Sequence, residues 1–443
     1  MKLDHKRTVL VGLAFFSICA FWQMYDNIIP LILTHTFQLD ETVCGAIMAA
    51  DNVLALFLLP FFGALSDRTS TRIGRRMPFI LGGTACAVVL MNLLPLFDNG
   101  YAATGEKAKL VLFVVALGLL LVAMGTYRSP AVALMPDVTP KPLRSKANAV
   151  INLMGSAGGI IVLALGMLFA TASVQNSLMS YTGYFGVIAA LMLAALVVFM
   201  LTVQEPRWAK EMQEQSVAAG LEDAEEAAHP TESRKLSADE VKSLLLILLS
   251  IVLWFFGYNA VTSKYSVYAS NILHKDYNLT LIIAQAAAIV AYLPVGFVAG
   301  RIGRKKTILA GVVMLTVAFG VAGFLTADSP SALMNAMFAL AGIAWATINV
   351  NSFPMVVELA SGGDVGKYTG FYYTASMAAQ VATPMVSGLL MDKFGMHVLF
   401  PYAAAFTGLA FVTMLFVRHG DSRDIPAEKA GDTDMTIEEL TND

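Results

Sequence analysis

Apolar stretches of about 20 residues recur along almost the whole chain, and each is long enough to cross the hydrocarbon core of a bilayer as a helix. A backbone in lipid must satisfy its own hydrogen bonds, so only helices and closed barrels cross membranes. These stretches are too long and too uniformly apolar for barrel strands. Composition agrees, because 57% of the 443 residues are apolar and only 14% are charged. The sequence therefore predicts an all-α protein embedded in a lipid bilayer.

We expect twelve transmembrane helices, six on each side of a polar stretch in the middle of the chain. The predicted spans are 8–34, 42–64, 77–97, 108–130, 146–172, 182–203, 241–262, 279–300, 307–326, 331–356, 368–391 and 396–417. This pattern divides the chain into an N-terminal six-helix bundle, a cytoplasmic linker, a C-terminal six-helix bundle and an acidic tail that we expect to be disordered. The corresponding residues are 1–203, 204–240, 241–418 and 419–443.

Lysine and arginine gather in alternate connections between the predicted spans. They precede the first span and follow the second, fourth and eighth, whereas the connection at 171–183 carries no charge. The positive-inside rule leaves such residues on the cytoplasmic side of the membrane. We therefore expect an integral protein of the cytoplasmic membrane, with both termini in the cytoplasm and the first helix retained rather than cleaved.

A basic turn after the second span returns after the eighth. The first copy reads GALSDR at 63–68 and GRR at 74–76, and the second reads VAGR at 298–301 and GRK at 303–305. Duplicated six-helix halves are the architecture of alternating-access transporters, which bind substrate between the halves near the middle of the membrane. The second copy lacks the aspartate, so the first is the better candidate for a device that holds one conformation.

We expect this device to be a conformational latch between the two halves. An aspartate can cap the start of a helix or pair with an arginine, and glycines allow helices to approach closely. The alternative, that the arginines only obey the positive-inside rule, does not explain the spacing of glycine and aspartate. The predicted latch residues are Gly63, Asp67, Arg68, Arg75, Arg76, Asp137, Arg144 and Arg301.

The motif Gly63-x-x-x-Asp67-Arg68, ending in Gly74-Arg75-Arg76, resembles the signature loop of the major facilitator superfamily. The full string at 63–80 is similar to the loop of sucrose transporters and glycoside–cation symporters. The resemblance covers the layout of the entire chain. It implies a major facilitator fold and uptake of a glycoside such as a disaccharide, driven by a proton or sodium gradient. Melibiose-type symporters have carboxylates where this chain has Ala55 and Leu59, so the resemblance does not extend to a sodium site, and we favour the proton.

Ionisable residues within the spans are the first candidates for function, because charge in a bilayer is costly. Asp26 lies mid-span beside Trp22, Gln23 and Asn27, which together offer acceptors for sugar hydroxyls and a flat apolar face for the ring. We expect these four residues to contact substrate. A structural ion pair of Asp26 is the alternative, and Asp26 is also a candidate for cation coupling.

Asp51 is the stronger candidate for proton coupling. A carboxyl group in an apolar span favours its neutral form and can take up and release a proton as access alternates. Arg128 can modulate that cycle, or it can form a static salt bridge with Asp51. Arg128 is also among the residues that we expect to bind substrate. Plant sucrose transporters place an arginine one turn later, where this chain has Val132, so the resemblance itself does not give Arg128 a sugar contact.

Further polar side chains lie at helical spacing and predict a wet cavity. We expect them to bind substrate, with hydrogen bonding between helices as the alternative. They are Asn148, Asn152, Tyr258, Asn259, Trp345, Asn349, Tyr372 and Gln380.

Other classes of function find no support in the sequence. The three cysteines, Cys19, Cys44 and Cys86, are unclustered within apolar runs, so neither a disulfide framework nor a metal site follows. There is no phosphate loop and no nucleophile elbow. We expect no enzyme activity, no cofactor and no nucleic-acid partner. A sensor that binds sugar without moving it remains the alternative from another class, and drug export would call for a more apolar cavity.

Overall fold

A computed structural model describes residues 3–39, 41–171, 179–221, 236–273, 278–360 and 364–421, and this part of the chain is helical throughout with short connections. The N-terminal half begins with α1, which continues into a π-helical turn at Ile32–Thr36. Its long helices are α1 (His5–Leu31), α2 (Glu41–Arg68), α3 (Met77–Thr104), α4 (Lys107–Asp137), α5 (Arg144–Leu168) and α6 (Thr182–Thr202).

The C-terminal half repeats this arrangement. Its first helix, α9, also continues into a π-helical turn, at Ala269–Leu273, in the position that the turn after α1 holds in the first half. The six long helices are α9 (Ala238–Tyr268), α10 (Asn278–Ile302), α11 (Arg304–Ala322), α12 (Ser331–Val357), α13 (Val365–Phe394) and α14 (Leu399–Leu415). Short 3₁₀ turns at Lys141–Leu143 and Met396–Val398 precede α5 and α14.

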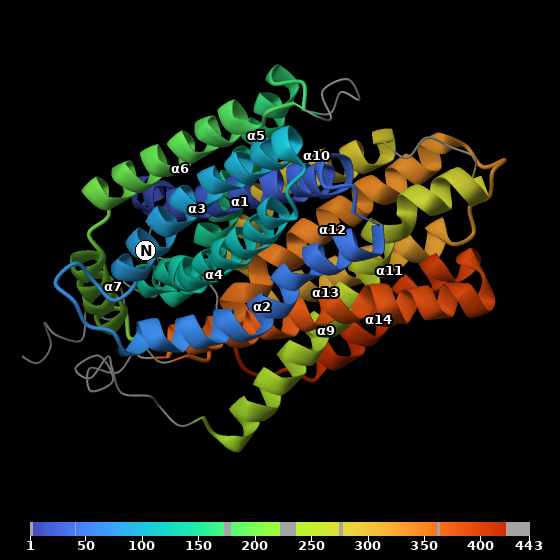
Figure 1. Cartoon of the computed structure of the whole chain (residues 1–443). Coiled ribbons are helices and arrows are strands. Elements are labelled where there is room, and N and C mark those ends of the chain that lie inside the picture. The colour runs from blue at the N-terminus through green and yellow to red at the C-terminus, as the bar shows by residue number, and fades with distance from the viewer. Residues whose placement is uncertain are drawn as a thin grey trace, which may run out of the picture.

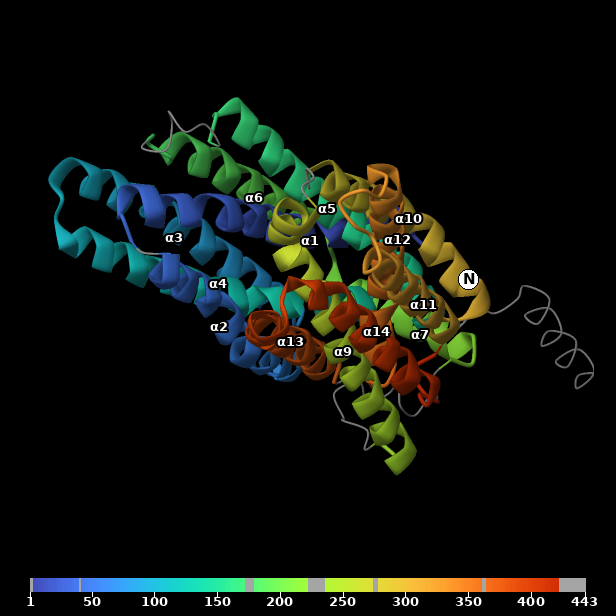
Figure 2. The same ribbon diagram turned by 90° about the vertical axis from the view of Figure 1, so that its right-hand side faces the viewer.

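The two halves lie side by side, with α1–α6 in blue to green and α9–α14 in yellow to red (Figures 1 and 2). Within each half the helices pack closely around an apolar interior, for example α1 on α5 and α10 on α12. The halves meet mainly where α2 packs on α13 and where α5 packs on α10. We call the end of the molecule that carries the α2–α3 and α10–α11 turns the basic end.

Eleven helices in the described part of the chain are long and apolar enough to cross a membrane. The predicted span that falls outside this set is α13, which has sufficient length but carries Tyr, Thr, Ser and Gln side chains along its course. These polar side chains face the interior of the protein, where several of them line a cavity described below. Each of the twelve predicted spans corresponds to one long helix.

A further helix, α7 (Glu205–Ala218), lies within the stretch 204–240 and packs at one end of the N-terminal half (Figure 1). The sequence did not predict the contacts that attach this helix to the N-terminal half. Most of the stretch 419–443, predicted to be a disordered tail, lies outside the described residues.

Candidate functional site

A cavity of about 190 Å³ lies between the two halves. Its described lining comes from α1, α4 and α5 of the first half and from α9, α12 and α13 of the second. Seven of the predicted substrate-binding residues line this cavity, namely Trp22, Arg128, Asn148, Asn152, Asn349, Tyr372 and Gln380.

Arg128 reaches the cavity from α4 and is held between two aromatic rings. Its Cζ lies 5.2 Å from the ring centre of Trp22 on α1 and 5.1 Å from that of Tyr373 on α13. Arg128 therefore touches both halves of the protein through cation–π contacts. Within the described residues, its buried Nε has no hydrogen-bond partner, and neither does the indole nitrogen of Trp22.

Asn148 joins the two halves at the wall of the cavity. Its Nδ2 donates to the backbone oxygens of Asn349 (3.1 Å) and Val350 (2.9 Å) on α12. The Nδ2 of Asn152 donates to the backbone oxygen of Asn148 at 2.8 Å. Part of the hydrogen-bonding capacity of these amides is therefore used between and within helices, and their side-chain oxygens remain as acceptors for a ligand.

Asp51 lies beside this cavity, in a small void of about 10 Å³ that it shares with Trp22 and Arg128. Its Oδ1 accepts a hydrogen bond from Asn52 at 2.9 Å. The described part of the chain shows no Asp51–Arg128 ion pair within 4.0 Å, so the static salt bridge is absent from this conformation. Asp26 is exposed on α1 and interacts electrostatically with both Asp51 and Arg128.

Other predicted residues lie away from the lining of the cavity. On α1, Asn27 donates to the backbone oxygen of Gln23. Tyr258 and Trp345 stack on each other, with ring centres 3.7 Å apart and planes inclined by 2°, so each covers a face of the other. Asn259 is next to this pair, and its Nδ2 is buried without a partner among the described residues.

Several lining residues were not predicted as substrate contacts. Cys19 and Phe15 precede Trp22 by one and two turns of α1, and Ser376 lies between Tyr372 and Gln380 on α13. Their positions follow the four-residue spacing of one helix face, so the polar stripe on α13 contained the signal for Ser376. Phe15 and Cys19 lack such a signal, because apolar residues occur on every face of a transmembrane helix.

At the basic end, the predicted latch forms around the buried side chain of Arg76. Its Nε donates to Asp137 Oδ2 at 2.8 Å, its Nη2 donates to Asp67 Oδ1 at 2.5 Å, and its Nη1 donates to the Ser66 hydroxyl. Arg75 also donates to Asp137, at 2.7 Å. Two carboxylates and two guanidinium groups thus neutralise each other out of water, which buried charges require.

Asp67 extends this network from α2 in the first half to α13 in the second. Its two carboxylate oxygens accept the backbone N–H groups of Gly366 and Lys367, each at 2.8 Å, at the start of α13. A negative charge at this place also complements the helix dipole. The backbones approach so closely here that a Cβ on Gly63 would overlap the carbonyl oxygen of Gly366.

The second half supplies a different contact at the same end. Arg304 donates to Glu358 at 2.6 Å within its own half, and to the Ser145 hydroxyl at 2.9 Å and the Lys141 backbone oxygen across the boundary. Arg144 donates to the Val357 backbone oxygen in the opposite direction, at 3.3 Å. The exposed residues Arg68 and Arg301 lie outside these networks.

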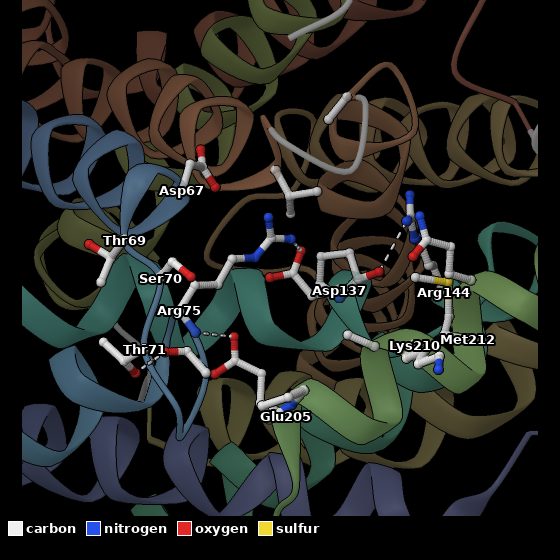
Figure 3. Close-up of a pocket in the computed structure, with 17 residues that line it drawn as sticks. Asp67, Thr69, Ser70, Thr71, Arg75, Asp137, Arg144, Glu205, Lys210 and Met212 are labelled. Carbon is white, nitrogen blue, oxygen red and sulfur yellow. Dashed lines mark hydrogen bonds and ion pairs between the residues drawn. The ribbon is translucent and has the colours of Figure 1, made fainter. Parts of the chain in front are cut away.

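Glu205, at the start of α7, is a latch component that the sequence analysis missed. Its carboxylate accepts the backbone N–H groups of Arg75, Arg76 and Met77 at 2.9, 3.0 and 3.1 Å, and so caps α3. Figure 3 shows the bond from Arg75. Burial, reinforced by the charge of Asp137, raises the pKa of Glu205. Asp421 caps α11 in the same way after the last helix of the second half. The sequence held a signal for both caps, because an acidic residue follows the sixth predicted span and another follows the twelfth.

A second cavity, of about 310 Å³, opens at this end between α7, the α2–α3 turn and the start of α13 (Figure 3). Figure 3 shows Arg75 between Asp137 and Glu205 on its wall. The first turn and the middle of α7 are tied to the start of α1, because Arg7 lies over the Trp208 ring and pairs with Glu211 at 2.6 Å. Hydrogen bonds from Arg207 and Arg7 lower the pKa of Glu211. Within the described residues, no cluster of His, Cys, Asp and Glu has the makings of a metal site.

Comparison with known proteins agrees with this architecture. Sucrose transport protein SUC3 of Arabidopsis thaliana is 30% identical over 173 residues, which are 36% of this chain and 28% of that protein. YagG of Escherichia coli (strain K12), named a glycoside/cation symporter, is 27% identical over 183 residues, which are 41% of this chain and 38% of that protein. The matched segments therefore span less than half the length of these curated relatives.

Among solved structures, the proton:xylose symporter XylE bound to 6-bromo-6-deoxy-D-glucose aligns over 97% of this chain and 98% of its own, with a TM-score of 0.68 and 16% identity. This likeness confirms the predicted fold. The sequence profile of the Major Facilitator Superfamily matches residues 11–290 and 274–439, which together cover nearly the entire chain. With its duplicated six-helix halves, its basic turns and this match, the chain belongs to the Major Facilitator Superfamily, whose transporters it resembles in fold and in sequence.

Proposed function

We propose that the protein is a secondary active transporter that carries a glycoside into the cell together with a proton, by alternating access. The observation that carries this proposal is a cavity between the halves, lined by aromatic, aliphatic, amide and hydroxyl side chains and one arginine, together with the contacts of Asp67, Arg144 and Arg304 that join the halves at the basic end. Breaking these contacts would let the cavity open at that end. The basic end is then the cytoplasmic one, as the positive-inside rule requires.

The cavity has the chemistry that a sugar needs. Trp22 and the tyrosines of α13 offer flat apolar surfaces for a sugar ring, and the amide side chains offer donors and acceptors for its hydroxyls. The relatives are in keeping with such a substrate, because their names describe sucrose, a glycoside and xylose as the transported compounds.

The charges near the cavity support coupling to one cation for each sugar. Asp26, Asp51 and Arg128 interact electrostatically, and two carboxylates against one guanidinium leave one negative charge in excess. Because uncompensated charge is costly within a membrane, one bound cation is favoured in the loaded state. We therefore expect one proton to accompany each sugar.

The surroundings of Asp51 favour a proton over sodium. The void beside its carboxylate measures about 10 Å³, and its described lining is otherwise formed by Ala, Leu, Gly, Trp and Arg side chains. A hard metal cation takes several oxygen ligands, whereas a proton needs only the carboxylate itself.

Uptake by the purified protein in vesicles tests this function. Labelled glycosides are offered under an inward proton gradient, an inward sodium gradient or no gradient, while a dye reports the internal pH. We expect accumulation above the external concentration only with the proton gradient, its loss on addition of a protonophore, and a proton-to-sugar flux ratio near one. Binding without accumulation would identify a sensor, and accumulation driven by sodium alone would exclude the proton.

A further inference from the structure

A buried carboxyl group lies at the end of the molecule opposite the basic end, and it takes no part in the cavity between the halves. It belongs to Asp98, in the last two turns of α3, and only 2% of this residue is exposed. Its Oδ1 has no hydrogen-bond partner among the described residues. The Thr36 side chain hydrogen-bonds to the carboxyl group, and Tyr181, whose own hydroxyl is buried without a described partner, interacts with it electrostatically.

No positive charge balances Asp98 in the part of the chain that the structure describes. Asp98 forms no ion pair within 4.0 Å there, and besides burial it is the hydrogen bond of Thr36 that acts on its charge. An uncompensated carboxylate is costly away from water, so the packed state favours the neutral acid. Other ionisable groups on the elements packed around Asp98 do not offset its charge, and they are His35, Tyr101, Glu106, Lys107, Lys109 and Tyr184.

The contact with Thr36 attaches the end of α1 to α3. Thr36 is the last residue of the π-helical turn Ile32–Thr36, which continues α1 and packs on α3. The same α1 carries Trp22 into the wall of the cavity. The packing of this helix at its far end therefore includes an acidic group that can change its charge.

We propose that Asp98 is a second proton-binding site, separate from Asp26 and Asp51, and that its proton keeps the end of α1 packed on α3. A neutral carboxyl group both donates and accepts hydrogen bonds, so it can satisfy the hydroxyls of Thr36 and Tyr181 together. The ionised group lacks a counter-charge, and local opening of the turn to water relieves this cost. In the orientation of the proposed function, this end faces the outside of the cell and takes its proton from there.

A proton suits this place better than a metal cation does. The side chains that act on the carboxyl group contribute two hydroxyl oxygens, whereas a hard metal cation takes about six or more oxygen ligands. Asp98 lines neither of the two larger cavities described above, so the contacts of its carboxyl group are those of close packing.

Hydrogen exchange of backbone amides in the purified full-length protein tests the proposal. Exchange of the segment Ile32–Thr36 is compared between wild type and Asp98→Asn at one pH at a time, which cancels the intrinsic pH dependence of exchange. The asparagine amide stays neutral at every pH. We expect equal rates at about pH 5, and at about pH 8 a rate about tenfold higher in wild type than in Asp98→Asn.

Asp328→Asn is the matched control. Asp328 is exposed in the connection after α11, the counterpart in the second half of the connection after α3. This variant should follow wild type at both pH values.

Infrared difference spectra observe the proton itself. We expect a C=O stretching band of a neutral carboxylic acid that disappears when the pH of wild type is raised, and that is missing from Asp98→Asn. Thermal unfolding and gel filtration establish that each variant is folded.

Three results would overturn the proposal. They are equal exchange in wild type and Asp98→Asn at the higher pH, infrared spectra that are the same in both proteins, and protection of the turn at the higher pH by sodium or potassium but not by choline, which would identify a metal site. None of these measurements needs a substrate. The second proton site can therefore fail while glycoside symport stands, and it can stand if glycoside symport fails.

Discussion

We propose that Asp51 is the residue that couples sugar transport to the proton gradient. Its carboxylate shares a void with Arg128 but forms no ion pair with it among the described residues. We expect Asp51→Asn to abolish proton-driven accumulation and to spare exchange of sugar across the membrane. The amide keeps the shape and the bond to Asn52 but cannot cycle a proton. Accumulation and counterflow in vesicles measure the two activities. Asp239→Asn, far along the chain at the start of α9, is the control, and undiminished accumulation in Asp51→Asn would remove this residue from the coupling role.

Asp67 links the halves at the basic end through two charge-assisted hydrogen bonds, from the backbone N–H groups of Gly366 and Lys367, and accepts a third from Arg76 within its own half. We expect Asp67→Asn to open this end more often. A loss of about 1.4 kcal/mol would raise the open population about tenfold. The readout is the alkylation rate of a single cysteine replacing Ala149, which is buried where α5 meets α10, in a background without the native cysteines.

Arg68→Gln is the matched control for this experiment, because Arg68 is exposed beside Asp67 and lies outside the network. An equal alkylation rate in wild type and Asp67→Asn would show that the cap of α13 does not hold the basic end closed.

The sequence revealed the charged residues but not their partners. Asp26, Asp51 and Arg128 stand out because charge is rare in apolar spans. Whether Arg128 meets a carboxylate or two aromatic rings depends on how α1, α4 and α13 are placed, and no spacing within one helix encodes this. Likewise, Tyr258 on α9 and Trp345 on α12 stack on each other, although the sequence of each helix taken alone predicted that the residue binds sugar.

Between elements, the closest approach of the two halves is the crossing of α2 and α13 at Gly63 and Gly366. We expect Gly63→Ala to cost about 1–3 kcal/mol, because the added methyl group overlaps a carbonyl oxygen of the opposite half and the backbones must separate. Thermal unfolding of the purified protein measures the cost.

Gly82→Ala on α3 is its control, since a Cβ there meets no atom within 4 Å. That substitution should be neutral or slightly stabilising, as alanine favours helix more than glycine does. Similar destabilisation by both substitutions would mean that the crossing of α2 and α13 is not a tight contact.

The sequence did not predict that α7 is attached to the first half, because the composition of this helix is that of an ordinary polar linker. Only the structure brings Glu205 to the three N–H groups at the start of α3. We expect Glu205→Ala to free this helix at a cost of about 1–2 kcal/mol and to speed tryptic cleavage after Arg207 and Lys210 several-fold.

Glu214→Ala serves as the comparison for Glu205→Ala, since Glu214 is exposed on the same helix and only loosely paired, at 3.8 Å from Lys210. Cleavage at the wild-type rate in Glu205→Ala would indicate that α7 is held by its other contacts, such as Glu211 with Arg7.

For the whole molecule, the repeat could be predicted because both halves keep glycine and arginine in the same turn. The structure adds that the two copies close the basic end by different chemistry. The first uses an aspartate against a helix start, and the second uses the guanidinium of Arg304 against a hydroxyl and a backbone oxygen.

The polar character of α13 also bears on how the protein is made. Of the helices in the described residues, eleven are long and apolar enough to cross a membrane, but α13 is not in that group. We expect α13, tested alone in a host protein with flanking glycosylation sites, to span the membrane much less often than α11, and equal insertion of the two would refute this. In the full chain, α2 and α9 have already been synthesised when α13 emerges from the ribosome, and they offer it a protein surface in place of lipid. We therefore expect α13, one of the helices that line the cavity, to depend on helices made before it for its place in the membrane.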